Sequence, residues 1–124
     1  MQQTIYKAKL SLKIIKERQA VDPVLFNVSE LTSITDYFLI VGGNSSRQVQ
    51  AITRDLRKKM RENGFRPYGI EGEQEGRWVL MDYGDIVIHI FHQPYREFYD
   101  LEGLWIEAPR VNLDDEQKEE NGQG

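Results

Sequence analysis

A glycine pair followed by two serines is the first place where this sequence could bind a phosphate. Gly42-Gly43 ends an apolar run, and Asn44-Ser45-Ser46 precedes a helical pattern. The N-terminus of a helix offers unpaired N–H groups and a favourable dipole to an anion. The segment lacks the lysine of a P-loop and the third glycine of a dinucleotide-binding loop. These absences favour a capped helix over the alternative, a nucleotidyltransferase-like or phosphate-binding enzyme that uses Gly42, Gly43 and Ser45.

The residues that bind metals or act as nucleophiles are sparse. The chain contains no cysteine, two histidines and no Asp-x-Asp pair that could hold magnesium. His89 and His92 lie three positions apart, so the alternation of a strand would turn them to different faces. Ser45 and Ser46 are better explained as helix caps than as members of a catalytic triad. We therefore predict no metal, no cofactor and no enzymatic activity.

The residue types best suited to binding another protein lie between Trp78 and Trp105. The run from Trp78 to Asp85 combines tryptophan, methionine and tyrosine with two aspartates, and aromatic residues are enriched at the energetic centres of interfaces. A period of two gives this strand two faces, Trp78, Leu80 and Asp82 on one and Val79, Met81 and Tyr83 on the other. One face must cover the core, and the sequence leaves open which. It equally leaves open whether His89 contacts a partner or forms a buried hydrogen bond.

Periodicity and turn residues predict an α/β domain with a mixed sheet. Helices are expected over 4–19 and from Ser45, with Gln48 completing a capping box, to a stop at Asn63-Gly64. Strands are expected over 24–28, 37–41, 65–70, 78–83 and 86–91, the last two as a hairpin joined at Gly84-Asp85. Asp22-Pro23 should break the first helix. Short helical turns over 95–99 and 101–105 should pack aromatic residues. We expect one domain over 1–111 and a disordered acidic tail over 112–124.

The charges are divided unevenly along a chain of 124 residues with a formal net charge of −4. Residues 1–61 hold 11 bases and 5 acids, whereas residues 62–112 hold 4 bases and 10 acids. A neutral domain with opposed halves is a poor general nucleic-acid binder. Peripheral RNA contact and a solvated surface are the alternatives for one basic helix face, formed by Arg54, Arg57, Lys58 and Arg61. No apolar run is long enough for a membrane helix and no signal peptide is evident, so we predict a soluble cytoplasmic protein.

Several motifs in order resemble the ribosomal silencing factor family, also called RsfS or Iojap. The first half of the resemblance is carried by Asp36–Ile40 and by Ser46–Val49 with Ala51-Ile52. The second half is carried by Gly72 with Glu73 and by the more specific runs Trp78–Asp85, Val87–Phe91 and Arg96–Trp105. The match covers about residues 5–107. Met81 stands where leucine is common in the family, and the acidic tail is an addition.

The resemblance implies a fold similar to the nucleotidyltransferase scaffold without its catalytic carboxylates. It also implies that the protein binds the large ribosomal subunit through ribosomal protein fourteen. The bound factor would block joining of the small subunit and lower translation when nutrients are scarce. The resemblance further implies a connection of the family with large-subunit assembly.

We expect the partner-binding residues to be apolar anchors and polar contacts of the acidic half, some of which must instead be structural. The candidates are Trp78, Met81, Asp82, Tyr83, Asp85, His89, Tyr99 and Glu102. Asp85 could cap the hairpin, and Trp105 should pack the C-terminal turns. A self-complementary sheet edge or Trp-rich face would make the free protein a homodimer, which is compatible with ribosome binding.

Overall fold

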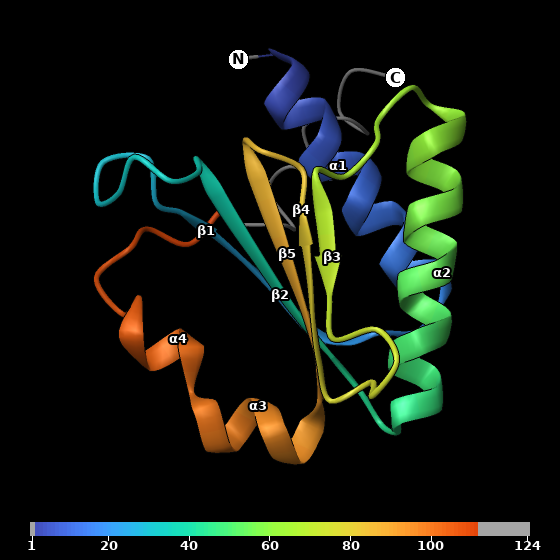
Figure 1. The fold of residues 1–124 in the computed structure, drawn as a ribbon. Coiled ribbons are helices and arrows are strands. Elements are labelled where there is room, and N and C mark those ends of the chain that lie inside the picture. Colours follow the sequence, from blue (N-terminus) through green and yellow to red (C-terminus); the bar gives the residue numbers. More distant parts are fainter. Residues whose placement is uncertain (1, 112–124) are drawn as a thin grey trace.

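Five strands form one mixed sheet in the computed structural model, which describes residues 2–111 (Figure 1). In chain order the elements are α1 (Gln2–Glu17), β1 (Val21–Asn27), β2 (Tyr37–Gly43), α2 (Ser46–Glu62), β3 (Gly69–Glu71), β4 (Trp78–Asp82), β5 (Ile86–His92), α3 (Gln93–Tyr99) and α4 (Leu101–Leu104). The strand order is β1-β2-β5-β4-β3. Only β2 and β5 pair in parallel, and the other neighbours are antiparallel. The predicted α/β fold with a mixed sheet and the hairpin between β4 and β5 are confirmed.

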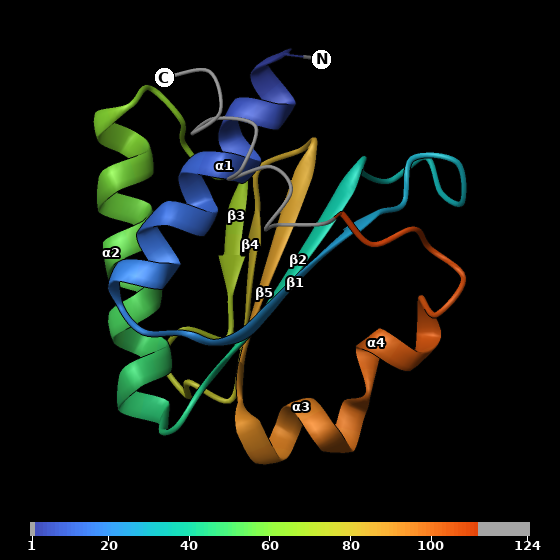
Figure 2. The same ribbon diagram turned by 180° about the vertical axis from the view of Figure 1, so that it is seen from behind.

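The sheet has helices on both faces (Figures 1 and 2). On one side α1 and α2 pack on a core that includes Leu39, Val41, Ile88 and Ile90. The alternate residues of the same strands point to the other side and form a second core with α3 and α4. The central pair, β2 and β5, is therefore buried on both sides, as the continuous apolar run in β2 predicted. Apolar runs in these two strands thus require two layers of helices.

The junction between β2 and α2 is a helix cap, and its polar groups are occupied. Ser45 Oγ accepts a hydrogen bond from the N–H of Gln48 at 3.0 Å. In a reciprocal capping box the Gln48 side chain would reach the N–H of Ser45. Here its Oε1 accepts instead from the N–H of Asn44, at 2.6 Å. The predicted serine cap is confirmed, but the side chain of Gln48 binds the N–H of Asn44 in place of that of Ser45.

Two predicted boundaries are wrong for local reasons. The first helix, expected over 4–19, spans Gln2–Glu17, and Asp22-Pro23, which were expected to break it, lie inside β1. The strand accommodates them because the pairing register shifts between Val21 and Val24 and Asp22 has φ of 44°. The strand expected over 65–70 is limited to Gly69–Glu71. The tail predicted to be disordered over 112–124 lies outside the described residues.

Asp85 connects α1 to the turn between β4 and β5 through polar contacts. Its carboxylate accepts a hydrogen bond from Thr4 Oγ1 at 2.7 Å and forms an ion pair with Lys7 Nζ at 3.0 Å. Burial alone would raise the pKa of Asp85, but the bonds from Thr4 and Lys7 outweigh burial and hold this pKa below its ordinary value. The ionised form of Asp85 is therefore favoured more strongly in the folded chain than in the unfolded chain.

Replacing Asp85→Asn should lower the free energy of unfolding by about 1–2 kcal/mol at pH 7, because a charged hydrogen-bond acceptor of two groups is lost. A carboxyl group with a lowered folded pKa contributes fully above its unfolded pKa, about 4, and loses this contribution as the pH falls through the folded pKa. Urea unfolding at pH 7 and pH 3 should show the difference between wild type and variant shrinking at pH 3. Asp36→Asn is the control, because Asp36 is exposed; equal losses in both variants would contradict the assignment.

Candidate protein-binding site

Trp78 at the start of β4 is fixed by a group of rings. It stacks on Phe91 with ring centroids 4.9 Å apart and lies 4.9 Å from Tyr99. Its indole N–H donates a hydrogen bond to His89 Nδ1 at 3.1 Å. The side chain is half-buried, so one part of the ring packs on the second core while another part reaches the surface. A rigid, half-exposed tryptophan is suited to anchoring a partner.

The sheet surface beside Trp78 is less covered than its centre. Helix α3 packs on β5 and β2, and the β4 residues that point to the same side are half-buried rather than buried. Leu80 pairs across the strands with Glu71 of β3, which is exposed. We call the resulting surface the open face; it consists of Glu71, Trp78, Leu80, Asp82 and Tyr99.

The open face combines apolar side chains with two carboxylates and has no basic member. Asp82 Oδ1 accepts the N–H of Gly84 at 2.8 Å, which fixes the carboxylate at the hairpin turn while the residue stays half-exposed. Tyr99 is 49% exposed at the end of α3. Such a surface is complementary to a partner that is apolar and basic. The predicted candidates Trp78, Asp82 and Tyr99 are brought to this surface.

Met81 and Tyr83 are not available to a partner, and their prediction as binding residues is corrected. They are 0% and 2% exposed on the face that packs against α1 and α2. Burial raises the pKa of Tyr83 to about 12. The alternation along β4 was predicted correctly, but the sequence did not tell which of its two faces was covered. Helices α1 and α2 cover the face that consists of Val79, Met81 and Tyr83.

His89 also lies inside the protein, and the alternative of a buried hydrogen bond is the one observed. It is 4% exposed among the rings of Phe38, Trp78 and Phe91. Its Nδ1 accepts from Trp78, whereas Nε2 has no hydrogen-bond partner within the described part of the chain. Burial lowers the pKa of His89 to about 4. Its predicted contact with a partner is corrected to a contact with Trp78.

Asp85 and Glu102 are both used in ion pairs within the chain. Asp85 binds Lys7 of α1, at the end of the sheet that lies away from Trp78. Glu102 accepts from Nε of Arg96 at 2.7 Å. Arg96 also donates to the carbonyl oxygens of Val21 and Asp22, at 3.0 and 2.7 Å, and so ties α3 and α4 to β1. Asp85 and Glu102 therefore stabilise the fold through these ion pairs, and their predicted contact with a partner stays untested.

Sequence analysis missed Arg96, Glu71 and the exposure of Leu80. Arg96 is buried although it is charged, and nothing in its sequence neighbourhood marks it as a structural arginine. The signal for Glu71 and Leu80 was present in the alternation of β4 and in the apolar Ile70 of the neighbouring strand. Their pairing, Glu71 opposite Leu80, depends on the register of β3 with β4. Trp105 packs on Phe38 with ring centroids 5.1 Å apart, as predicted for the C-terminal turns.

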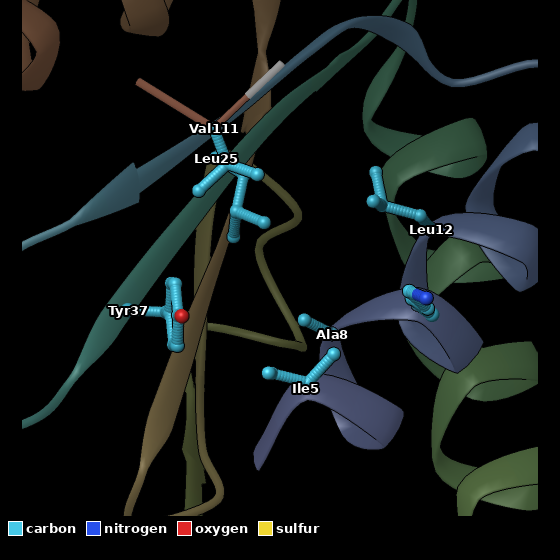
Figure 3. A pocket seen from close by; sticks show the side chains of 7 residues that line it. Ile5, Ala8, Leu12, Leu25, Tyr37 and Val111 are labelled. Atoms are coloured by element: carbon cyan, nitrogen blue, oxygen red, sulfur yellow. The ribbon is translucent and has the colours of Figure 1, made fainter. Parts of the chain in front are cut away.

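Two depressions lie outside the open face. A hollow of about 620 Å³ between α3, α4 and the start of β1 has Asp22, Glu97, Asp100 and Glu102 in its lining together with Arg96 and Arg110. A small apolar pocket between α1 and the strands β1 and β2 is lined by residues that include Ile5, Leu12, Leu25 and Tyr37 (Figure 3). Its space of about 10 Å³ suffices for roughly one water molecule.

Within residues 2–111 no three His, Asp or Glu side chains come close enough together to hold a metal ion. No helix in the same range has the length and apolar character to cross a membrane.

Comparisons with known proteins agree on one family. The family model described as "Ribosomal silencing factor during starvation" (RsfS) matches residues 1–124. Ribosomal silencing factor RsfS of Bacillus subtilis is 42% identical over 106 residues, which cover 86% of this chain and 90% of the relative. Mitochondrial assembly of ribosomal large subunit protein 1 of Mus musculus is 34% identical over 97 residues, or 76% of this chain and 42% of the mouse protein. A crystal structure of a Chromobacterium violaceum protein has a TM-score of 0.79 at 34% identity and covers 81% of this chain and 83% of that one.

Replacing His89→Gln should reduce the sensitivity of the fold to mild acid. A histidine whose pKa falls from 6.5 to about 4 on folding is protonated in the unfolded chain before the folded one, so stability is lost as the pH falls from about 6.5 toward 4. Between pH 7.5 and 5.0 this loss amounts to about 2 kcal/mol. The glutamine amide can still accept the Trp78 N–H but does not titrate.

Urea unfolding at both pH values measures the effect, and His92→Gln is the matched control because His92 is the other histidine. The assignment fails if wild type and His89→Gln lose the same free energy of unfolding between pH 7.5 and 5.0.

Proposed function

Because this chain belongs to the ribosomal silencing factor family, we propose that it is a translational repressor that binds the large ribosomal subunit. We propose further that the contact is made with ribosomal protein fourteen of that subunit and that the bound factor sterically blocks joining of the small subunit. The observation that carries this proposal is the open face, an apolar and acidic surface around a fixed tryptophan. Ribosomal proteins are generally basic, so the charge of this face suits such a partner.

The mechanism requires affinity and bulk rather than chemistry. A specific interface takes about 800 Å² from each partner, which is close to a tenth of the 7605 Å² surface of the described chain. The remaining body of the domain would then stand between the two ribosomal subunits. The relatives are named for silencing or for assembly and not for a reaction, which supports a non-enzymatic role.

The family description refers to starvation, and we propose that repression operates when nutrients are limited. The mouse relative is named for assembly of the large subunit of the mitochondrial ribosome. A role in large-subunit assembly is therefore a second proposal, and it would use the same binding to the large subunit. Self-association of the free protein through the open face stays a prediction, and such a dimer would have to dissociate before its subunits bind the ribosome.

Tyr99→Ala should weaken binding to purified large subunits by at least about tenfold, because Tyr99 is a half-exposed aromatic residue beside Trp78 and such residues act as hot spots. Tyr6→Ala is a matched control, because Tyr6 is also 49% exposed and belongs to α1, a helix on the opposite side of the sheet from α3 (Figure 2). Co-sedimentation measures binding. Equal affinity of the two variants would exclude the open face as the docking site.

Addition of small subunits then tests repression. With saturating wild-type protein, the fraction of joined subunits in a sucrose gradient should fall, and Tyr99→Ala should restore it at the same concentration. The repressor proposal fails if subunits join normally while wild-type protein is bound, or if the wild-type protein remains free of large subunits.

A further inference from the structure

A row of four cations runs along the solvent side of α2. Arg47, Arg54, Lys58 and Arg61 are all exposed, and at 3.6 residues per turn their directions fall within about 60° of one another. The buried residues Val49, Ile52, Leu56 and Met60 point to the sheet. The row, which we call the α2 ridge, is about 21 Å long. It lies on the face of the molecule opposite α3 and α4 (Figures 1 and 2).

The acids that form ion pairs around α2 bind cations outside the ridge, and the exposed Glu62, four residues after Lys58, forms no ion pair within residues 2–111. Arg57 pairs with Glu73 at 2.6 Å, and Lys59 pairs with Glu17 at 3.1 Å. Asp55, which is buried, pairs with Arg18 at 3.2 Å and Lys59 at 3.5 Å. No ion pair is formed by any of the four ridge cations within residues 2–111.

Most of the ridge also works against the stability of its own helix, although the helix dipole favours Arg61 in the last turn. Arg54 and Lys58 are four residues apart and Lys58 and Arg61 are three apart, so like charges face each other. Arg47 lies in the first turn, where the helix dipole disfavours a positive charge, and that turn has no acidic residue. These charges break the usual preferences for charge spacing and helix dipole in a helix, and no contact within the described chain compensates. Such exceptions point to a contact with another molecule.

We propose that the α2 ridge binds the phosphate backbone of structured RNA. The choice of RNA rests on the proposed ribosomal function, whereas the need for an anionic partner rests on the ridge alone. No aromatic residue occurs in α2, so stacking on single-stranded bases is not available. Contacts to phosphates alone give affinity that depends on salt and not on sequence. An anionic membrane is disfavoured, because the apolar side of α2 is already buried against the sheet.

The ridge therefore adds a second binding surface of opposite charge to the open face. The sheet separates the two surfaces, so one flat partner cannot cover both. On a ribosomal subunit, a basic protein would occupy the open face while neighbouring RNA faces the ridge. Such a two-sided contact would orient the protein, because exchanging its two faces would place like charges together.

The test is binding of the full chain to a 16-base-pair RNA duplex, followed by fluorescence anisotropy from 25 to 200 mM salt. The variant R54Q/K58Q removes two ridge cations, and the control K13Q/K16Q removes two exposed cations of α1 with the same change in net charge. Each lost phosphate contact lowers the salt dependence, so we expect the slope of log K against log salt to fall by about 2 for R54Q/K58Q. For K13Q/K16Q the slope should equal that of wild type. Thermal unfolding should show R54Q/K58Q at least as stable as wild type, because repulsion within α2 is relieved.

The inference is overturned if wild-type protein does not bind the duplex at 25 mM salt, if both double variants lose the same slope, or if vesicles containing phosphatidylserine bind the ridge and the duplex does not. Tyr99→Ala should bind the duplex like wild type, because Tyr99 lies on the other side of the sheet. A failure of duplex binding with intact co-sedimentation on large subunits would reject the ridge and leave the proposed function standing. Loss of co-sedimentation with intact duplex binding would do the reverse.

Discussion

The parallel pair β2 and β5 sets the constraint on which the rest of the structure depends. Both strands are apolar on both sides, and their residues are almost all buried. Such a pair is stable only when helices cover each face. The long helices α1 and α2 cover most of one face, whereas α3 and α4 have seven and four residues. The short pair covers β2 and β5 but leaves the residues of β4 that point to its side half-exposed, and this difference in coverage creates the open face.

Side chains that look functional in the sequence divide according to this coverage. Trp78 and Met81 lie three residues apart in one strand, yet Trp78 is half-exposed and Met81 is in the core. His89 is a polar residue within the second core, and its role is to accept the hydrogen bond of Trp78. The candidate site is therefore supported from beneath by a residue that does not touch the surface itself. The same burial lowers the pKa of His89, so in mild acid the unfolded chain is expected to bind a proton that the folded chain does not.

Charge is arranged in the same two layers. The helices α1 and α2 contain ten of the 16 lysines and arginines, whereas residues 71–107 hold nine acids and two arginines. Ion pairs cross between elements at Lys7–Asp85, Arg57–Glu73 and Arg96–Glu102, and these pairs hold α1, the loop after β3 and the α3–α4 segment in place. The cations that they leave over are concentrated on α1 and α2, but Arg77 and Arg110 lie on the side of α3 and α4. On our proposals, a basic protein would meet the open face and an anionic polymer would meet the α2 ridge, without a change of shape.

The sequence by itself determined the order and type of the main elements, because periodicity, caps and turns act over a few residues. It also determined the family, since the runs Trp78–Asp85 and Arg96–Trp105 are specific in their order. It predicted the two faces of β4 correctly, because alternation is a local property of a strand. Only the tertiary structure decided which face is exposed, because this depends on where α1, α2, α3 and α4 pack. Likewise, the pairing of Asp85 with Lys7 joins two elements far apart in sequence, and no local pattern reveals their proximity. Arg96 and Glu102 are close in sequence, but the bonds from Arg96 to the carbonyl oxygens of β1 depend on the tertiary fold.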